Sequence, residues 1–362
     1  DGRIICVLSD GLGSGVKANV LASLTATMAS RYIAEEPDVR RAAEIIMRTL
    51  PVCRERRISY ATFSIIDIQA DGRAQIVEYD NPSFLYFRGG RQTEVDRGVI
   101  ELPRRFEHKE ERLHFSRVDL QVEDRLVFFS DGVTQSGMGS PRYPLGLRRQ
   151  GAADFTQSVI LSNESVSAGE LARRVTIQGC RLDAHEPKDD ITCGVIYFRN
   201  PREALIATGP PLDRERDKIL ARRLSGFQGK RVICGGTTAQ LAARELGKEL
   251  RVDLSSRDLK IPPSAQMDGI DLVTEGMLTL AETERLLEKK EGYESGKDNA
   301  ARRLCRLLLE SDKVSFLVGT RINDAHQDPD MPVEIGIRRT LVRRISDLLE
   351  KQYLKSTRIE YI

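Results

Sequence analysis

Three short motifs in the first half of the chain each place an aspartate beside a segment with the composition of a β-strand. They are Asp10-Gly11-Leu12-Gly13-Ser14-Gly15, Ser130-Asp131-Gly132-Val133 and Asp189-Asp190-Ile191-Thr192. The first two follow apolar runs at residues 4–8 and 125–129, and the third leads into the run at 191–198. Strand ends are rigid, so they can direct several carboxylates at one point. Carboxylates gathered without cations raise one another's pKa values, and a hard divalent metal with oxygen ligands relieves that repulsion. The motifs therefore predict a carboxylate-bound metal centre that carries out hydrolysis.

Each motif taken alone has a plainer interpretation. Asp-Gly is common in tight turns, an aspartate pair can begin a bend, and a glycine-rich loop before a helix also fits nucleotide binding. The dinucleotide fingerprint needs a βαβ unit, whereas two helices and a hairpin are expected after Gly15. No Gly-Lys-Ser/Thr follows, which excludes a P-loop. The presence of all three motifs, each beside a strand, favours the metal centre.

Composition restricts the classes of partner and cofactor. The 362 residues exceed one typical hydrophobic core, so two domains are expected. The 56 basic and 54 acidic side chains leave a net charge of +2, which gives no reason to expect nucleic acid or a membrane surface as a partner. No apolar run approaches the ~20 residues that span a bilayer. The four histidines show no metal-ligand spacing. The six cysteines lack paired spacing and indicate free thiols in a reducing cytoplasm: Cys6, Cys53, Cys180, Cys193, Cys234 and Cys305.

Residues 1–200 are expected to be mostly antiparallel strands with a few long helices. Asp71-Gly72 predicts a hairpin between strands at 62–68 and 74–79. Further strands are predicted at 84–87, 114–122, 125–129 and 191–198, and helices at 16–32, 39–50 and 168–182. The fold class predicted for this half is α+β, an antiparallel β-sandwich with flanking helices.

Residues 1–198 resemble the metal-dependent serine/threonine protein phosphatase family (PPM, or type 2C), in particular its bacterial SpoIIE-like branch. The resemblance rests on Ser9 to Gly15 with Ala18, on residues 129–133 and 189–192, and on residues 79–85 with Gly89-Gly90. It implies a phosphoserine/phosphothreonine phosphatase of bacterial signalling whose β-sandwich holds two Mn²⁺ or Mg²⁺ ions at its edge. The partner would be a phosphorylated protein, and a metal-activated water would attack phosphorus.

The resemblance also implies roles for individual residues. Asp10 would bridge the two metals and Gly11 would offer its backbone carbonyl to one of them. Asp131 and Asp189 would hold the other, so these three aspartates are the expected catalytic residues. Asp190 and Thr192 are expected beside the ligands, with Thr192 fixing the turn by hydrogen bonding. Oxygen ligands suit Mg²⁺ and Mn²⁺ better than zinc or copper, and two ions ~3.5–4 Å apart can polarise a phosphoryl oxygen.

Two features of the family pattern have no match in the sequence. The strand and aspartate that precede the first motif in the family are absent, since the sequence begins at Asp1-Gly2. No arginine is assigned to clamp the phosphate. Arg142 and Arg148 follow Asp131 in a flap-like segment, where solvated surface arginines are the commoner interpretation.

The second half has a different pattern. A linker is predicted at 201–215 around Gly209-Pro210-Pro211, followed by a smaller α/β domain at 216–362 with strands at 231–234, 270–274 and 314–318. A long basic helix at 337–354 is expected to close the chain. The Gly235-Gly236-Thr237-Thr238 junction could present backbone N–H groups to a small anionic ligand, or it could be an ordinary turn with threonine caps. The polar run at 323–330 could bind a metal but is more typical of a surface loop.

Three hypotheses for function follow. The first is a phosphoprotein phosphatase whose second domain senses a ligand or partner, and a homodimer is compatible with it. The second is a non-catalytic module that binds phosphoproteins, and the third is a nucleotide- or anion-binding regulator built on the second domain. Intact Asp10, Asp131 and Asp189 favour the enzyme.

Overall fold

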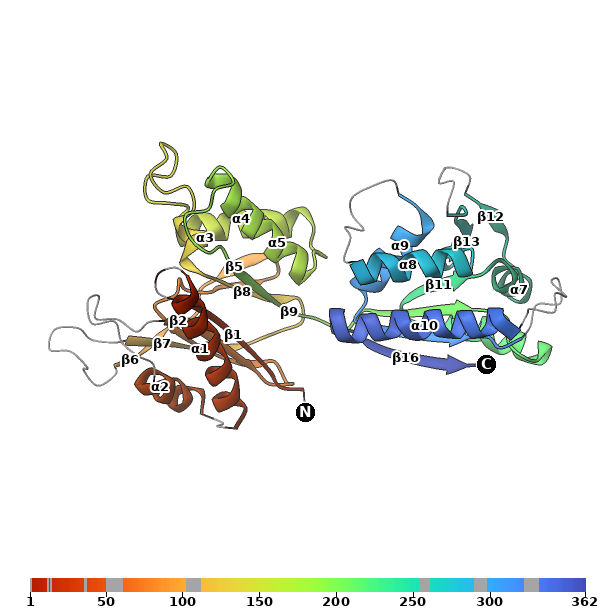
Figure 1. Ribbon diagram of the computed structural model, residues 1–362, viewed down its shortest axis with the longest axis horizontal. Coiled ribbons are helices and arrows are strands. Elements are labelled where there is room, and N and C mark those ends of the chain that lie inside the picture. Colours follow the sequence, from red (N-terminus) through yellow and green to blue (C-terminus); the bar gives the residue numbers. More distant parts are fainter. Residues whose placement is uncertain are drawn as a thin grey trace. The chain divides into compact units, whose positions relative to one another are not determined.

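The computed structural model describes residues 2–11, 13, 15–35, 38–49, 61–101, 112–253, 261–289, 298–321 and 332–362, with side chains omitted at 332–335. Leu12 and Ser14 of the first motif, Cys53 and the polar run at 323–330 lie outside these residues. The chain divides after Asn200 into two compact units, residues 1–200 and 201–362 (Figure 1).

The first unit contains two antiparallel sheets. A five-stranded sheet has the order β1-β2-β3-β7-β6, with β1 at Ile4–Gly11, β2 at Ala61–Ile68, β3 at Arg73–Tyr79, β6 at Gly98–Glu101 and β7 at Arg112–Asp119. A four-stranded sheet has the order β5-β4-β8-β9, with β4 at Leu85–Arg88, β5 at Arg91–Thr93, β8 at Asp124–Phe129 and β9 at Cys193–Phe198.

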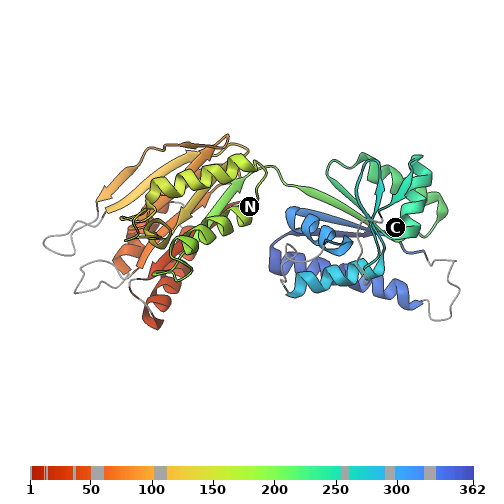
Figure 2. The same ribbon diagram turned by 90° about the horizontal axis from the view of Figure 1, so that it is seen from above.

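Helices cover the outer face of each sheet (Figures 1 and 2). The five-stranded sheet packs against α1 (Val16–Glu35) and α2 (Val39–Thr49). The four-stranded sheet packs against α3 (Asp131–Gln135), α4 (Arg148–Ser162) and α5 (Ala168–Leu182). The predicted α+β sandwich with flanking helices is confirmed, although α4 was not predicted.

The alternation of apolar residues along the strands explains why the sheets stack in this way. In β8, Val127 and Phe129 face the helices while Leu126 and Phe128 face the other sheet. Successive side chains of a strand point to opposite faces, so the four consecutive apolar residues at 126–129 must be covered on both sides. Each fully buried side chain of this size contributes about 1.5–3 kcal/mol. The strand ends that carry the aspartates are therefore anchored in two hydrophobic layers.

The second unit is built on one seven-stranded sheet in the order β12-β13-β14-β11-β10-β15-β16. Its strands are β10 at Glu203–Thr208, β11 at Lys230–Cys234, β12 at Leu250–Val252, β13 at Ala265–Met267, β14 at Ile270–Thr274, β15 at Lys313–Val318 and β16 at Ser356–Tyr361. The strands from β14 to β16 are parallel, and β12 and β13 add an antiparallel edge.

Two layers of helices enclose this sheet (Figure 2). After the short 3₁₀ turn η1 (Arg214–Arg216), α6 (Asp217–Gly226) and α7 (Gly236–Leu246) pack on one face. On the other face lie α8 (Met277–Lys289), α9 (Ala300–Glu310) and α10 (Pro332–Tyr353). The first strand of the unit, β10, is the middle one of the five parallel strands. The chain then adds β11 to β14 on one side of it and returns to the other side for β15 and β16. This is a doubly wound arrangement.

Two expectations for the second half were wrong. The predicted linker at 201–215 contains β10, the middle one of the five parallel strands, which is buried because helices cover both of its faces. The six residues of β10 were assigned to the linker because the turn-forming sequence Gly209-Pro210-Pro211 follows them directly. The chain also does not close with the basic helix, because β16 follows α10 and pairs with β15 in parallel.

Candidate metal centre

The end of β1 is fixed by its pairing with β2 and by the helix that follows it. Asp10 lies opposite Thr62 in the antiparallel register, and the Ser9 hydroxyl donates a hydrogen bond to the Thr62 carbonyl (2.9 Å). A Cβ on Gly11 would lie 2.2 Å from the carbonyl oxygen of Ala18. Only glycine therefore allows the first turns of α1 to lie this close to the strand end that carries Asp10.

The second and third motifs are joined by Ser130. Its backbone N–H donates to the carbonyl of Thr192 (3.0 Å), and its hydroxyl donates to the carbonyl of Asp190 (2.6 Å). The same hydroxyl accepts a hydrogen bond from the N–H of Thr192 (3.0 Å). A Cβ on Gly132 would lie 2.4 Å from the carbonyl oxygen of Asp190. The beginning of α3, which carries Asp131, is thereby held against the loop before β9. Thr192 takes part in this turn through its backbone N–H and carbonyl.

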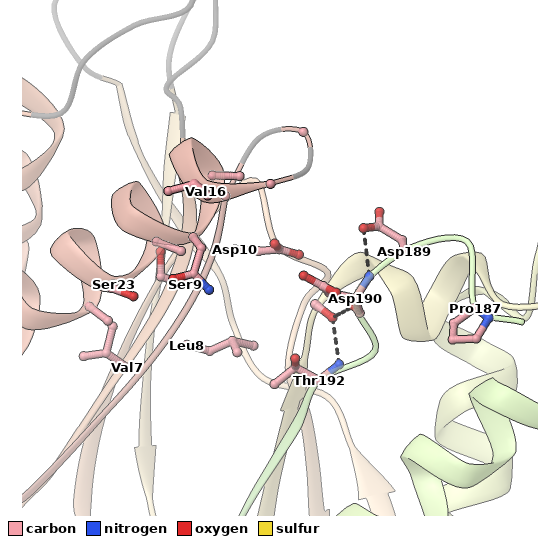
Figure 3. Close-up of a pocket in the computed structure, with 18 of the residues that line it drawn as sticks. Val7, Leu8, Ser9, Asp10, Val16, Ser23, Pro187, Asp189, Asp190 and Thr192 are labelled. Carbon is pink, nitrogen blue, oxygen red and sulfur yellow. Dashed lines mark hydrogen bonds between the residues drawn. The ribbon is translucent and has the colours of Figure 1, made fainter.

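An open cleft of about 930 Å³ lies between α1, the end of β1 and the loop before β9. Asp10, Asp189 and Asp190 line it together with Ser130. Figure 3 shows Asp10 on one side of the cleft and Asp189 and Asp190 on the other, with the Asp10 carboxylate directed toward the opposite loop. Residues from the three motifs thus meet at one place, although the first motif lies more than a hundred residues before the other two.

The carboxylates in and beside this cleft influence one another electrostatically. The pKa of Asp10 is raised to about 6, first by burial and then by the charges of Asp131, Asp189 and Asp190 in that order. The pKa of Asp131 is raised by burial first and then by the charge of Asp189. A concentration of negative charge in a half-buried position favours either protons or a cation.

The donor atoms fit a hard divalent ion. The described residues that line the cleft include no histidine or cysteine, and their side-chain oxygen donors are carboxylates, hydroxyls and one amide. Such a donor set suits Mg²⁺ or Mn²⁺. Within the described residues, however, no three His, Cys, Asp or Glu side chains are grouped closely enough to hold one ion. The charges of Asp131, Asp189 and Asp190 all act on Asp10, so the four carboxylates are neighbours at this edge of the sandwich. Carboxylates without a cation between them repel one another, and Asp189 is exposed.

The carboxylates of Asp131 and Asp189 each accept a hydrogen bond from within the protein. The Gln135 side-chain amide donates to Asp131 Oδ2 (2.7 Å), and the Asp190 N–H donates to Asp189 Oδ1 (2.9 Å). Each contact occupies one carboxylate oxygen, and the Asp131 carboxylate also accepts a backbone hydrogen bond from Gly132. Asp80 was not predicted to lie near the site, but its charge also raises the pKa of Asp131. Its only sequence signal is its place in the Asp80-Asn81-Pro82 turn.

The predicted anion site of the second unit lies at the beginning of α7. Gly235 is the N-cap residue, with a φ of 133°, and no side chain caps the helix. The Gly235 N–H donates to the carbonyl of Thr274 (2.9 Å). Gly236 begins the helix, Thr237 follows it, and the Thr238 hydroxyl is buried without a hydrogen-bond partner in the described structure. The four residues are therefore together at the carboxyl end of β11.

The sandwich and its edge of interacting aspartates define a class, the PP2C-type phosphatases. A family model described as "Stage II sporulation protein E (SpoIIE)" matches residues 1–199, more than half of the chain, and the protein belongs to this family. A search of curated proteins finds no match.

Solved structures give more distant similarities. The RsbU and RsbW domains of a Mycobacterium tuberculosis protein are 19% identical, with 62% of this chain and 59% of that chain covered and a TM-score of 0.42. The phosphatase domain of SpoIIE from Bacillus subtilis is 16% identical, with 55% and 82% covered and a TM-score of 0.38. A longer SpoIIE fragment from the same organism is 18% identical, with 55% and 54% covered and a TM-score of 0.42. In the described residues no helix is long and apolar enough to cross a membrane.

Proposed function

We propose that residues 1–200 form a metal-dependent phosphatase that removes phosphate from phosphoserine or phosphothreonine in a partner protein, in cytoplasmic bacterial signalling. The observation that supports it best is the raised pKa of Asp10, about 6, caused by burial and by three neighbouring aspartates. Membership of the SpoIIE family supports the same reaction class.

The proposed ligands come from three places in the fold. Asp10 and the Gly11 carbonyl lie at the end of β1, Asp131 begins α3, and Asp189 lies in the loop before β9. Two Mn²⁺ or Mg²⁺ ions bound there would supply Lewis-acid polarisation of the phosphoryl group and a water of lowered pKa. Asp190 would act through its backbone, since its carbonyl holds Ser130 in place. The open cleft admits a phosphorylated side chain from solvent.

The test is phosphate release from an aryl phosphate and from a phosphoserine peptide. Activity should be abolished by EDTA and restored by Mn²⁺ better than by Zn²⁺, because the ligand set contains only oxygen. Activity that persists in EDTA or depends on zinc would refute the two-metal assignment. Peptide binding without turnover at saturating Mn²⁺ would favour the alternative, a non-catalytic phosphoprotein-binding module.

A second candidate function belongs to residues 216–362, binding of a small anion or nucleotide that biases the phosphatase. It is favoured by the uncapped N-terminus of α7 together with the buried, unpartnered hydroxyl of Thr238, the nearest atom to a Cβ built on Gly235 (3.3 Å). Free N–H groups at a helix N-terminus attract anions. Thermal-shift measurements with inorganic phosphate and with ATP test it: stabilisation should be lost in Gly236→Val, and no stabilisation by either probe would refute it.

A further inference from the structure

A second cleft of about 720 Å³ adjoins the carboxylate cleft. It lies between the β3–β4 connection at 79–83, the beginning of β7 and the beginning of α4. Asp131 lines this second cleft, and the preceding residue, Ser130, lines the first. The two clefts therefore meet at the beginning of α3, beside the proposed metal ligands.

The two clefts carry opposite charge. The carboxylate cleft has three aspartates and one lysine, whereas the second cleft has four arginines against two aspartates: Arg97, Arg112, Arg148 and Arg149 against Asp80 and Asp131. His114 also lines the second cleft, and burial together with Arg97 and Arg112 lowers its pKa, so it is neutral at pH 7. The second cleft is called the arginine cleft below.

Two of the four arginines hold the walls of the arginine cleft. Arg97 forms an ion pair with the buried carboxylate of Glu78 (2.6 Å). Arg149 donates to the backbone carbonyls of Ser83 (3.4 Å) and Phe84 (3.2 Å) and thereby joins α4 to the β3–β4 connection. The guanidinium groups of Arg97 and Arg149 are therefore partly occupied by contacts within the protein.

Arg148 differs from the other arginines. Its side chain is exposed and makes no hydrogen bond or ion pair across the described part of the chain. Its charge is therefore available to a ligand. An exposed guanidinium presents several N–H donors in a plane, which suits carboxylate and phosphate oxygens.

The backbone just before Arg148 packs against α3 and the residue after it, and this contact holds Arg148 at the cleft. A Cβ on Gly146 would lie 2.6 Å from the carbonyl oxygen of Thr134, and the Leu147 N–H donates to the carbonyl of Ser136 (2.9 Å). Arg148 then adopts a φ of 61°, and Asp80 on the facing wall has a φ of 57°. Each such non-glycine conformation costs on the order of 1 kcal/mol or more, and these conformations concentrate at functional sites.

We propose that the arginine cleft binds an acidic segment beside the phosphorylated residue of the substrate protein, with Arg148 as its main charge contact. This inference rests on the proposed phosphatase function and names the substrate class for it. A volume of about 720 Å³ exceeds the needs of one phosphate group, and the arginines come from three separate segments. Contacts on several walls suit a peptide whose carboxylates are spread along its length.

The test compares two phosphoserine peptides of equal length, one flanked by glutamates and one by glutamines. Wild type should prefer the glutamate peptide in kcat/KM. Arg148→Ala should reduce that preference by about 3- to 10-fold, as expected for one charge-assisted contact. Arg148→Lys should retain part of it. Arg142→Ala, which removes an exposed arginine of the same segment that does not line the cleft, should leave the preference as in wild type.

Other outcomes would overturn the assignment. An equal loss for both peptides in Arg148→Ala would mean that this arginine acts on the phosphoryl group itself. An unchanged preference would mean that the arginine cleft does not bind the flanking segment.

Binding measured without turnover separates this inference from the proposed function. The probe is the fluorescein-labelled glutamate peptide, followed by fluorescence anisotropy in EDTA. Binding that Arg148→Ala weakens by about 3- to 10-fold supports the cleft even if no phosphate is released with Mn²⁺, in which case the phosphatase proposal fails alone. Turnover of both peptides with no effect of Arg148→Ala on binding or preference refutes the cleft and leaves the phosphatase proposal standing.

Discussion

Replacing Asp10 by asparagine should have opposite effects on the stability of the metal-free and the metal-loaded protein. In the absence of metal, burial and then the charges of Asp131, Asp189 and Asp190 raise the pKa of the Asp10 carboxylate from 3.8 to about 6. The folded protein therefore binds this proton more tightly than the unfolded chain does. Its stability falls as pH rises from about 4 to about 6, and the full penalty is present at pH 7.

The size of the penalty follows from the shift. Two pKa units correspond to about 3 kcal/mol, and solvent screening of this half-buried group reduces the figure to about 1–2 kcal/mol. Asp10→Asn removes the charge and keeps the shape. In EDTA at pH 7.5 the variant should unfold about 2–6 °C higher than wild type, and the difference should vanish near pH 4. With Mn²⁺ the order should reverse, because the variant loses a proposed ligand.

The assay is thermal unfolding of both proteins in EDTA and in Mn²⁺ at pH 4, 6 and 7.5. Asp119→Asn, an exposed aspartate at the end of β7, is the matched control and should change little. Destabilisation of metal-free Asp10→Asn at pH 7.5 would refute the argument that the carboxylates repel one another. A stability gain that is the same at pH 4 and pH 7.5 would show that charge is not its cause.

Four further substitutions have distinct expected outcomes. Asp189→Asn should reduce phosphate release at saturating Mn²⁺ by about 100-fold or more, because it removes a proposed direct ligand. Asp190→Asn should have a milder effect, because Asp190 contributes its backbone carbonyl. An equal loss of activity in both variants would mean that the roles of the pair are misassigned. Gly132→Ala should displace the loop before β9, since its Cβ would lie 2.4 Å from the Asp190 carbonyl oxygen, and should lower Mn²⁺-dependent turnover; turnover equal to wild type would show that this contact does not position the site. Gly319→Ala should destabilise the second unit by about 1–3 kcal/mol, because its Cβ would lie 2.1 Å from the Pro210 carbonyl oxygen, and calorimetry that finds no loss would contradict that steric argument.

The sequence was informative where a pattern is local. Apolar runs beside Asp10, Asp131 and Asp189 predicted that each lies at a strand end. Asp10 and Asp131 lie at the ends of β1 and β8, whereas β9 begins at Cys193 and leaves Asp189 in the loop before it. The hairpin at Asp71-Gly72 was predicted for the same reason, since turn chemistry and strand periodicity coincide there. The roles of the aspartates as metal ligands remain predictions.

Features that depend on distant segments were not predictable in this way. β10 is only six residues long, and its central place follows from pairing with β11 and β15 rather than from its own composition. The hydrogen bonds of Ser130 to Thr192 and Asp190 link positions about sixty residues apart. The arginine cleft likewise combines residues near 80, 112 and 148, which the sheet order and the return of the chain to α3 bring together.

The central claim is that Asp10, Asp131 and Asp189 hold divalent ions on which phosphate release depends. The most direct test titrates metal-free protein with Mn²⁺ and follows, in the same samples, bound Mn²⁺ by equilibrium dialysis and phosphate release from a phosphoserine peptide. We predict two Mn²⁺ ions per chain, turnover that rises as the sites fill, and loss of both in Asp10→Asn. Full turnover in metal-free protein, or Mn²⁺ binding and turnover unchanged in Asp10→Asn, would contradict the claim.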